Sequence, residues 1–327
     1  EIPYVTGLYL PEAIWVTHGP GAARAVADLM TAGTCELDLR ELDANRFAPH
    51  WAARSYIRTR GAQNYREVYD IIHPRDVVTA PRGLRQSPFY ERQKELGAVF
   101  TESNGWERPL WFEANSSLPV PEGASRQTEW DRKHWSPIAG AEHVATRTSA
   151  GLFDMSTFTK IHVYGPGALA AMETISCSHV NKPVDGVSYA LLLNERGGVE
   201  SDLTVVRTGE NHFVLMCGSG SGPRDLAWVQ RRLLDMDRVR VDDITSGGAA
   251  LGLWGPNAPA IVQSLTDTDL NPAGFPRFTQ KHVFVAGAPV RLIRISYVGE
   301  EGYELHTATE YAGHVWEAVW EAGQQHG

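Results

Sequence analysis

The sequence has few cysteines and no long apolar run, which limits the kinds of protein it can encode. Its 327 residues include three cysteines, Cys35, Cys177 and Cys217, without paired spacing, so we expect neither a disulfide framework nor a metal knuckle. Such usage indicates a reducing interior, the cytoplasm or, in a eukaryote, the mitochondrial matrix. No apolar run reaches the ~20 residues of a membrane helix and no secretory signal is visible, so we expect no membrane partner.

An excess of positive charge is also lacking. The formal net charge is −9, which argues against a nucleic-acid partner. The motifs H-E-x-x-H, paired C-x-x-C and G-x-S-x-G are absent, so nothing supports a zinc or serine hydrolase, and we expect no metal site. What is present is an ordinary globular composition, 43% hydrophobic and 21% charged, in a chain long enough for two domains.

The first part of the chain contains a strand–turn–helix pattern. Ala13–Thr17 predicts a buried strand, and Ala22–Ala32 predicts a helix closed by Gly33, with a Gly-Pro-Gly turn between the two. The dinucleotide fingerprint G-x-G-x-x-G is absent, because Arg24 occupies the place of its last glycine. A strand–helix unit that closes an α/β domain is therefore favoured over a phosphate site.

An aromatic-rich middle segment follows. Tyr65, Val68, Tyr69 and Ile72 fall at i, i+3, i+4 and i+7, which predicts an amphipathic helix over Ala62–Ile72. The loop-rich stretch after it is dense in Trp, Phe and Tyr, and such residues fill a core or a domain interface more often than they bind a ligand.

The last two thirds of the chain predict an α+β domain, because strand and helix patterns alternate without strict order. The predicted strands are Val187–Leu193, Leu203–Thr208, His212–Cys217, Ala249–Trp254, His282–Ala286 and Val290–Ser296, and the predicted helices include Glu142–Thr148 and Glu310–Ala322. Ile161 and Val163 alternate with Lys160 and His162, which predicts a half-buried strand. No internal repeat is evident.

Two segments carry candidate chemistry: NERGGVESDLTVVR, which holds Asp202, and YVGEEGYELH, which holds Tyr297 and Glu304. Each places carboxylates beside a glycine turn, where a carboxylate can act as an acceptor or a base. Structural roles are also open. An Asp at a hairpin corner commonly bonds nearby amides, Glu304 could be a solvated acid at a strand edge, and Tyr189 and Tyr297 could belong to the core.

The order of several segments resembles a known family. EHVATRTSAGLFDMSTFTKIHVYGPGA, SYALLLNERGGVESDLTVVR, ALGLWGPNA and RISYVGEEGYELH resemble the folate-binding fold of the glycine-cleavage T-protein (aminomethyltransferase). They are more similar to its copy fused to flavin-dependent dimethylglycine and sarcosine dehydrogenases or oxidases. The family's usual Asp-Asp pair is Ser201-Asp202 here, the form typical of the flavin-fused branch.

Upstream, EAIWVTHGPGAARAVADLM resembles the last strand and helix of an amine-oxidase-type FAD domain, and RSYIRTRGAQNYREVYDIIHP resembles the central connecting domain of the same enzymes. The resemblance implies an FAD-domain tail at 1–46, a central α+β connecting domain at 47–130 and a folate-binding domain at 131–327. Because the sequence starts at Glu1 and the end of the family fold is missing, we expect a piece of a longer protein.

The resemblance also implies an activity: oxidative N-demethylation of dimethylglycine, sarcosine or a similar N-methyl amino acid. FAD, bound mostly by a domain absent here, would oxidise the N-methyl carbon, and this piece would capture the one-carbon unit on tetrahydrofolate as 5,10-methylenetetrahydrofolate. Asp202 would be catalytic, and Tyr189, Tyr297 and Glu304 would bind the pterin. The expected partners are the amine substrate, folate and the missing FAD domain. The alternative is a non-catalytic folate-binding module or a module that docks the flavin domain.

Overall fold

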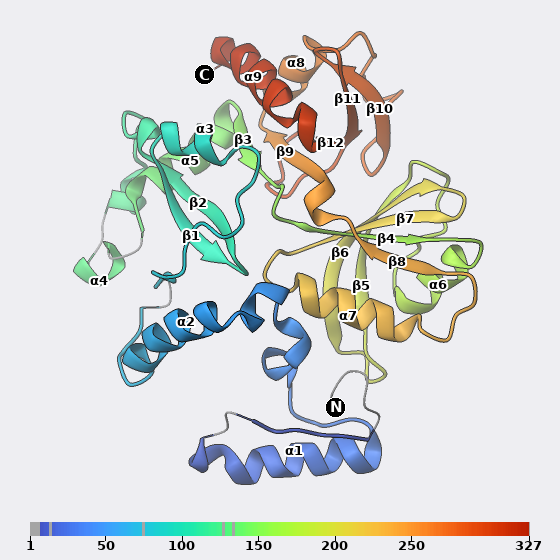
Figure 1. Cartoon of the computed structure of the whole chain (residues 1–327). Helices are drawn as coiled ribbons and strands as arrows, with labels where there is room; N and C mark the ends of the chain where they lie inside the picture. The colour runs from blue at the N-terminus through green and yellow to red at the C-terminus, as the bar shows by residue number, and fades with distance from the viewer. Residues whose placement is uncertain (1–6, 13–14, 74–75, 126–127, 133–134, 327) are drawn as a thin grey trace. The chain divides into compact units, whose positions relative to one another are not determined.

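The computed structural model describes residues 7–12, 15–73, 76–125, 128–132 and 135–326, and the chain divides into two compact units, 1–46 and 47–327. In the first unit, helix α1 (Gly19–Ala32) ends at Gly33, whose φ of 70° is left-handed, so the predicted helix is confirmed (blue in Figure 1).

The strand predicted at Ala13–Thr17 is wrong where it can be judged; residues 13–14 lie outside the described residues. Val16 and Thr17 belong to a 3-10 turn, η1 (Val16–His18), and Val16 is 94% exposed. A strand needs a neighbour for its backbone groups, and the described part of this unit contains no other strand.

The second unit begins with helices and one hairpin. Its first elements are η4 (Pro49–Ala52), α2 (Arg54–Glu67), α3 (Tyr90–Glu95), β1 (Ala98–Ser103), β2 (Trp106–Phe112), α4 (Glu129–Arg132) and α5 (Pro137–Thr148). The helix predicted over Ala62–Ile72 is misplaced, since α2 ends at Glu67. Tyr65 and Tyr69 are 76% and 74% exposed, so their spacing matched the helical period without marking a buried stripe. The structural role of the later aromatics is confirmed for Phe89, which is buried and stacks on Trp316.

Two five-stranded antiparallel sheets make up the rest of this unit, as predicted for an α+β fold. Sheet 1 has the order β5-β6-β7-β4-β8 and sheet 2 the order β10-β11-β12-β9-β3. The strands are β3 (Gly151–Asp154), β4 (Thr159–Tyr164), β5 (Val187–Leu193), β6 (Val199–Gly209), β7 (His212–Cys217), β8 (Arg240–Asp243), β9 (Gly248–Trp254), β10 (Gln280–Val285), β11 (Ala288–Ile293) and β12 (Gly302–Ala308). The helices between them are α6 (Ala168–Ile175), α7 (Gly222–Arg232), α8 (Ala258–Gln263) and α9 (Ala312–Gly323).

The two sheets are built from a duplicated unit, which corrects the expectation of no internal repeat. In each half a strand, a helix, three strands and a helix follow one another: β4-α6-β5-β6-β7-α7 and then β9-α8-β10-β11-β12-α9. The sequences DMSTFTKIHVYGPGA and DITSGGAALGLWGPNA open the two halves. The repeat was missed in the sequence because a strand requires only that apolar residues alternate with others. Many different residues satisfy this, so two equivalent strands can differ in sequence.

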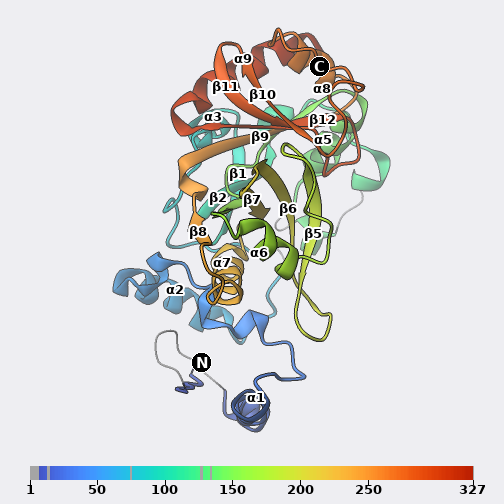
Figure 2. The same cartoon turned by 90° about the vertical axis from the view of Figure 1, so that its right-hand side faces the viewer.

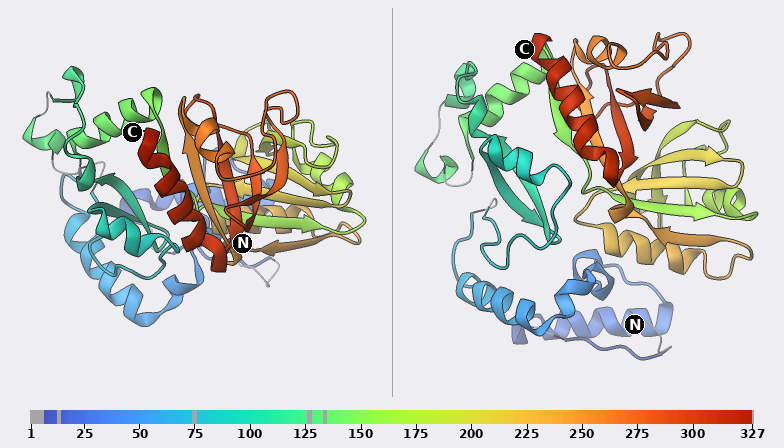
Figure 3. Two further views of the ribbon diagram at one scale, coloured as in Figure 1. Left: turned by 90° about the horizontal axis from the view of Figure 1, so that it is seen from above. Right: turned by 45° about the horizontal axis from the view of Figure 1, so that its top comes forward.

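The short strand that precedes each half pairs with the sheet of the other half. β3 directly precedes β4 in the chain but pairs with β9 in sheet 2, and β8 directly precedes β9 but pairs with β4 in sheet 1. Matching backbone bonds follow each crossing: Met155 N–H donates to the Ala250 carbonyl and Ile244 N–H to the Lys160 carbonyl, both at 2.9 Å. The crossings, green and orange, can be followed in Figures 1 and 3. The exchange ties the two sheets into one folding unit.

Helices cover only one face of each sheet. α8 and α9 lie on the side of sheet 2 that faces away from sheet 1 (Figure 2), and α6 and α7 pack on the corresponding face of sheet 1. Between the sheets the buried apolar cluster is small; it consists of Val187, Val206, Val214, Met216 and Ile293, with Ile295 against it. The candidate site lies in the remaining inter-sheet space, where a few polar side chains stand among apolar ones such as Met155 and Phe158.

Candidate functional site

Strand β6 presents Asp202 because its neighbour Ser201 is anchored on the opposite face. The Ser201 hydroxyl donates to Asp225 Oδ2 at 2.9 Å, and Asp225, at the start of α7, also pairs with Arg224. Side chains alternate across a strand, so Asp202 and Thr204 both point away from α7. Tyr189 on β5 donates its hydroxyl to Asp202 Oδ2 at 3.1 Å, and this bond raises the pKa of Tyr189.

Strand β12 presents Glu304 and His306 to the same inter-sheet space, since Tyr303 and Leu305 point the other way into the helix-covered core. Glu304 is 2% exposed and its Oε2 lies 2.8 Å from His306 Nε2. A solvated acid at a strand edge is therefore excluded for Glu304. Burial lowers the pKa of His306, although the hydrogen bond with Glu304 opposes this.

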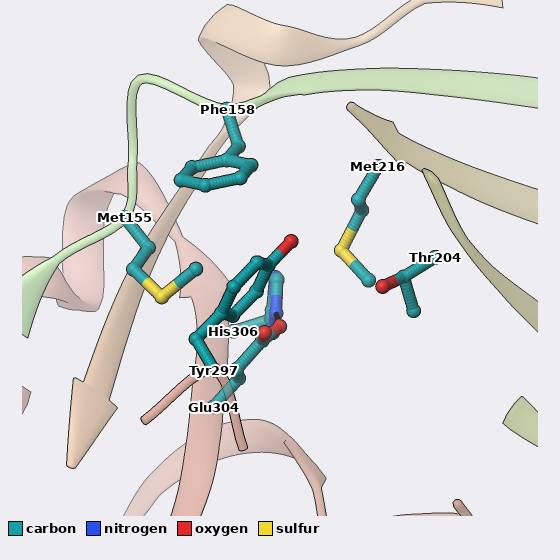
Figure 4. A pocket seen from close by; sticks show the side chains of 7 residues that line it. All are labelled: Met155, Phe158, Thr204, Met216, Tyr297, Glu304 and His306. Atoms are coloured by element: carbon teal, nitrogen blue, oxygen red, sulfur yellow. Dashed lines mark hydrogen bonds and ion pairs between the residues drawn. The ribbon is translucent and has the colours of Figure 1, made fainter. Parts of the chain in front are cut away.

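A small pocket joins the two strands (Figure 4). It is lined by Met155, Phe158, Thr204, Met216, Tyr297, Glu304 and His306. In the view of Figure 4 the Tyr297 ring stands in front of the Glu304–His306 pair, with Met155 and Phe158 on one side and Thr204 and Met216 on the other. The free volume of the pocket is only about 10 Å³, whereas ligand pockets usually enclose about 300–1,000 Å³, so a bicyclic ligand here requires a side chain at the mouth to move. Tyr297, more than half exposed, is the side chain with that freedom.

The hydroxyl end of Tyr297 lies in the pocket although more than half of its side chain is exposed. Burial of that end, followed by the charges of Glu304 and Asp202, raises the pKa of Tyr297 to about 12. Tyr297 is therefore a neutral hydroxyl at physiological pH and can donate as well as accept. The exposure of Tyr189 and Tyr297, 55% and 58%, excludes a core role for both.

Two cations face Glu304, a buried lysine from sheet 1 and a half-buried arginine from the neighbouring strand of sheet 2. Lys160 on β4 is 2% exposed and its Nζ donates to the carbonyls of Ser156 and Phe158 at 2.9 and 3.1 Å. Burial lowers the pKa of Lys160 to about 8, against the attraction of Asp154 and Glu304. Burial also lowers the pKa of Arg291 on β11, while Glu304 opposes the shift. These cations offset the negative charge of Glu304.

All four predicted site residues lie at this inter-sheet space, in two pairs. Tyr189 is hydrogen-bonded to Asp202, while Tyr297 and Glu304 line the pocket. Asp202 is not a lining residue, but Thr204, two residues further on the same face of β6, is. The roles assigned to the four residues stay predictions.

Sequence reasoning missed His306 and the burial of Lys160. The alternation Glu304-Leu305-His306 was a signal, because residues two apart share a strand face. Lys160 was expected on the exposed side of a half-buried strand, and this is wrong. Sheet 2 covers that side of β4, a contact that no local pattern encodes.

Within the described ranges, no group of three or more His, Cys, Asp or Glu side chains is placed to hold a metal ion. No helix of those ranges combines the length and the apolar character needed to cross a bilayer. A carboxylate, an imidazole and neutral tyrosines around an apolar pocket can orient a ligand rich in N–H groups and accept a proton from it.

The fold and this site define a class: a two-sheet α+β domain with a pocket between its halves that is lined by a buried carboxylate and an imidazole. Residues 89–327 match the family described as GCVT N-terminal domain, and residues 32–87 match the FAD dependent oxidoreductase central domain. The chain therefore belongs to the GCVT family, with an FAD dependent oxidoreductase central domain ahead of it, as the sequence motifs predicted.

Individual relatives agree with this assignment. The chain is 30% identical over 313 residues to the 4-methylaminobutanoate oxidase (formaldehyde-forming) of Paenarthrobacter nicotinovorans, with 95% of this chain and 37% of the relative covered. It is 30% identical over 369 residues to the mitochondrial sarcosine dehydrogenase of Homo sapiens, with 100% and 40% covered. The chain thus spans less than half the length of these two relatives.

A solved structure supports the fold. The glycine cleavage system aminomethyltransferase T of Bartonella henselae superposes with a TM-score of 0.55 at 26% sequence identity. The superposition covers 72% of this chain and 57% of the other. The T-protein-like fold expected from the sequence is confirmed.

Proposed function

We propose that this chain is the folate-side part of an FAD- and tetrahydrofolate-dependent oxidative N-demethylase. The substrate is dimethylglycine, sarcosine or a similar N-methyl amino acid, and the product is 5,10-methylenetetrahydrofolate. The observation that carries the proposal is the buried Glu304 carboxylate facing the same inter-sheet space as the Tyr189–Asp202 pair, in a chain of the GCVT family.

The acceptor groups of the pocket fit a pterin. A pterin presents a ring N–H beside an exocyclic amine, and a carboxylate can accept both hydrogen bonds at once. Glu304 is buried in a pocket otherwise lined mainly by apolar side chains, where such charge-assisted bonds discriminate well. Bound there, tetrahydrofolate supplies the amine nucleophile for the one-carbon unit. Tyr297 covers the ring and Glu304 orients it.

Asp202 has a separate role in the proposal. Its carboxylate is held by the Tyr189 hydroxyl at 3.1 Å and is fixed in direction by the anchoring of Ser201 to Asp225. An ionised carboxylate of this kind orients an N–H group and accepts its proton during the reaction. Binding and proton acceptance are thus divided between Glu304 and Asp202.

Flavin does not fit the residues of this chain, because the dinucleotide fingerprint is missing from the sequence. We assign FAD to the longer protein and residues 1–46 to the tail of its FAD domain. Residues 47–130 form the connecting domain in this proposal, residues 131–327 form the folate domain, and the cytoplasm or mitochondrial matrix is the location.

The test compares Asp202→Asn with Glu304→Gln in the full-length flavoprotein. Asn removes the charge and the base, so formation of methylenetetrahydrofolate should fall by about two to four orders of magnitude, while folate affinity changes little and amine oxidation continues. Gln opposes a donor with its NH₂ group, so folate binding should weaken by roughly 2–5 kcal/mol, while the capture step survives at saturating folate. Stopped-flow flavin reduction and product quantification are measured together.

Asp235→Asn is the matched control, because Asp235 is an exposed carboxylate just beyond α7. It should leave both measurements unchanged. Equal, small effects of the two site variants would refute the roles given to both carboxylates. A non-catalytic folate module would instead keep its folate affinity in Asp202→Asn and show no product in either protein, and a docking module would bind no folate.

A further inference from the structure

We infer that His306 is a positioning residue of this site: its Nε2–H holds the Glu304 carboxylate in register, and its Nδ1 accepts a hydrogen bond from a donor group of the bound pterin. This inference rests on the proposed function and adds a specificity contact to it. It is carried by the geometry of β12 and of the pocket.

Strand alternation places Glu304 and His306 side by side on the inter-sheet face, and both line the pocket. They are 2% and 6% exposed, and Glu304 Oε2 lies 2.8 Å from His306 Nε2. Nδ1 of His306 is buried and has no hydrogen-bond partner among the described residues. A buried acceptor of this kind is costly unless a donor reaches it.

The protonation state follows from the surroundings. The groups that face His306 are Glu304 on its own strand, Lys160 on β4 and Arg291 on β11; burial and the two cations lower the pKa of His306, and Glu304 opposes them. The imidazole is therefore neutral near pH 7 and carries one N–H. Because an ionised carboxylate only accepts, that N–H is on Nε2 and Nδ1 is left as an acceptor.

The first half of the molecule shows that the fold does not require this histidine. In the first half, Met216 on β7 pairs with Thr204 on β6. In the second half, His306 on β12 pairs with Arg291 on β11. Met216 therefore occupies the position in the first half that His306 occupies in the second. An apolar side chain of similar size is tolerated there. The His306→Met variant therefore places at this position the residue that the first half already has there, and it should fold.

The experiment uses the full-length protein and calorimetric titration with tetrahydrofolate under anaerobic conditions. His306→Met loses the donor to Glu304 and the acceptor for the ligand, so affinity should fall by about 10- to 100-fold. His306→Gln keeps an amide donor for Glu304 but not the ring acceptor, so its loss should be smaller, about three- to tenfold. Thermal unfolding checks that both variants are folded.

A double-mutant cycle with Glu304→Gln separates positioning from mere packing. If His306 acts partly through Glu304, the double variant Glu304→Gln/His306→Met should bind only about three- to tenfold more weakly than Glu304→Gln alone, because the direct Nδ1 contact is still lost but the contribution made through Glu304 is already gone. Additive losses, or a His306→Met protein that binds like the unaltered one, would overturn the inference. If His306→Met does not fold, His306→Gln decides: unchanged affinity refutes the Nδ1 contact. Absence of folate binding by the unaltered protein would instead overturn the proposed function, and the inference with it.

Discussion

The two halves of the sheet unit share one architecture but differ on the face between the sheets. On β7 the inter-sheet residues are Val214 and Met216, and at the equivalent places of β12 they are Glu304 and His306. The helix-covered faces of both halves are mainly apolar. The comparison teaches that helix packing fixes the shape of both halves, while the inter-sheet face is free to diverge, and the candidate site arises from that divergence.

The largest expected effect tests what the halves share. Gly165 and Gly255 follow the opening strands, with φ of 114° and 134°, and an added Cβ would lie 2.3 Å from the Arg238 carbonyl and 2.4 Å from the Ser149 carbonyl. Replacing either by Ala should lower the free energy of unfolding by about 2–6 kcal/mol, from backbone strain and overpacking together. Urea unfolding measures it.

Gly247→Ala is the control, because its Cβ would meet no atom within 4 Å and its φ is not positive. It should leave the free energy of unfolding nearly unchanged. If only one of the two turn glycines proves sensitive, the halves do not share the same constraint.

A second prediction concerns a residue that differs between the halves. The backbone N–H of Lys160 donates to Thr245 Oγ1, and in the other half the backbone N–H of Ala250 donates to Ser156 Oγ in the same way. Lys160 and Ala250 therefore occupy equivalent positions. The pKa of Lys160 is about 8 in the folded protein, against 10.5 for a free lysine side chain in the unfolded chain. Between these values the unfolded chain binds more protons, so stability rises with pH there, by about 2 kcal/mol from pH 8 to 10.

Urea unfolding as a function of pH checks this for the unaltered protein and for Lys160→Ala. The variant should lack the rise, whatever its absolute stability. The comparison stops at pH 10 because free tyrosine titrates there while Tyr297, with its pKa of about 12, does not. Parallel curves for the two proteins would show that Lys160 is not a depressed buried amine.

The smallest expected effect concerns the hydrogen bond between Tyr189 and Asp202 in the first half. Tyr189→Phe removes the hydroxyl that donates to Asp202, so product formation should fall by about two- to tenfold, because an exposed hydrogen bond contributes little. Tyr164→Phe is matched to it, since Tyr164 donates to Asp242 at 2.6 Å at the other side of sheet 1. That control should retain full activity. Equal rates for the two variants would remove Tyr189 from the proposed site.

Much of the local structure followed from the sequence. The bounds predicted for β5 and β7 are those observed, and α9 and β9 differ from their predictions by one or two residues. The helix predicted over Ala62–Ile72 was misplaced, because exposed aromatic residues happened to have the spacing expected of the buried face of a helix. The spacing of apolar residues predicts a helix reliably only where another part of the protein covers the apolar side of that helix.

The sequence by itself determined the α+β class, the family, and the glycine turns beside which Asp202 and Glu304 lie, because side-chain alternation and turn residues are local properties. Only the tertiary structure decided that β3 and β8 are exchanged between the two sheets, that Lys160 is buried, and that His306 lines the pocket beside Tyr297. Each of these depends on pairing between segments far apart in the chain, where burial and charge come from a neighbour that no local pattern identifies.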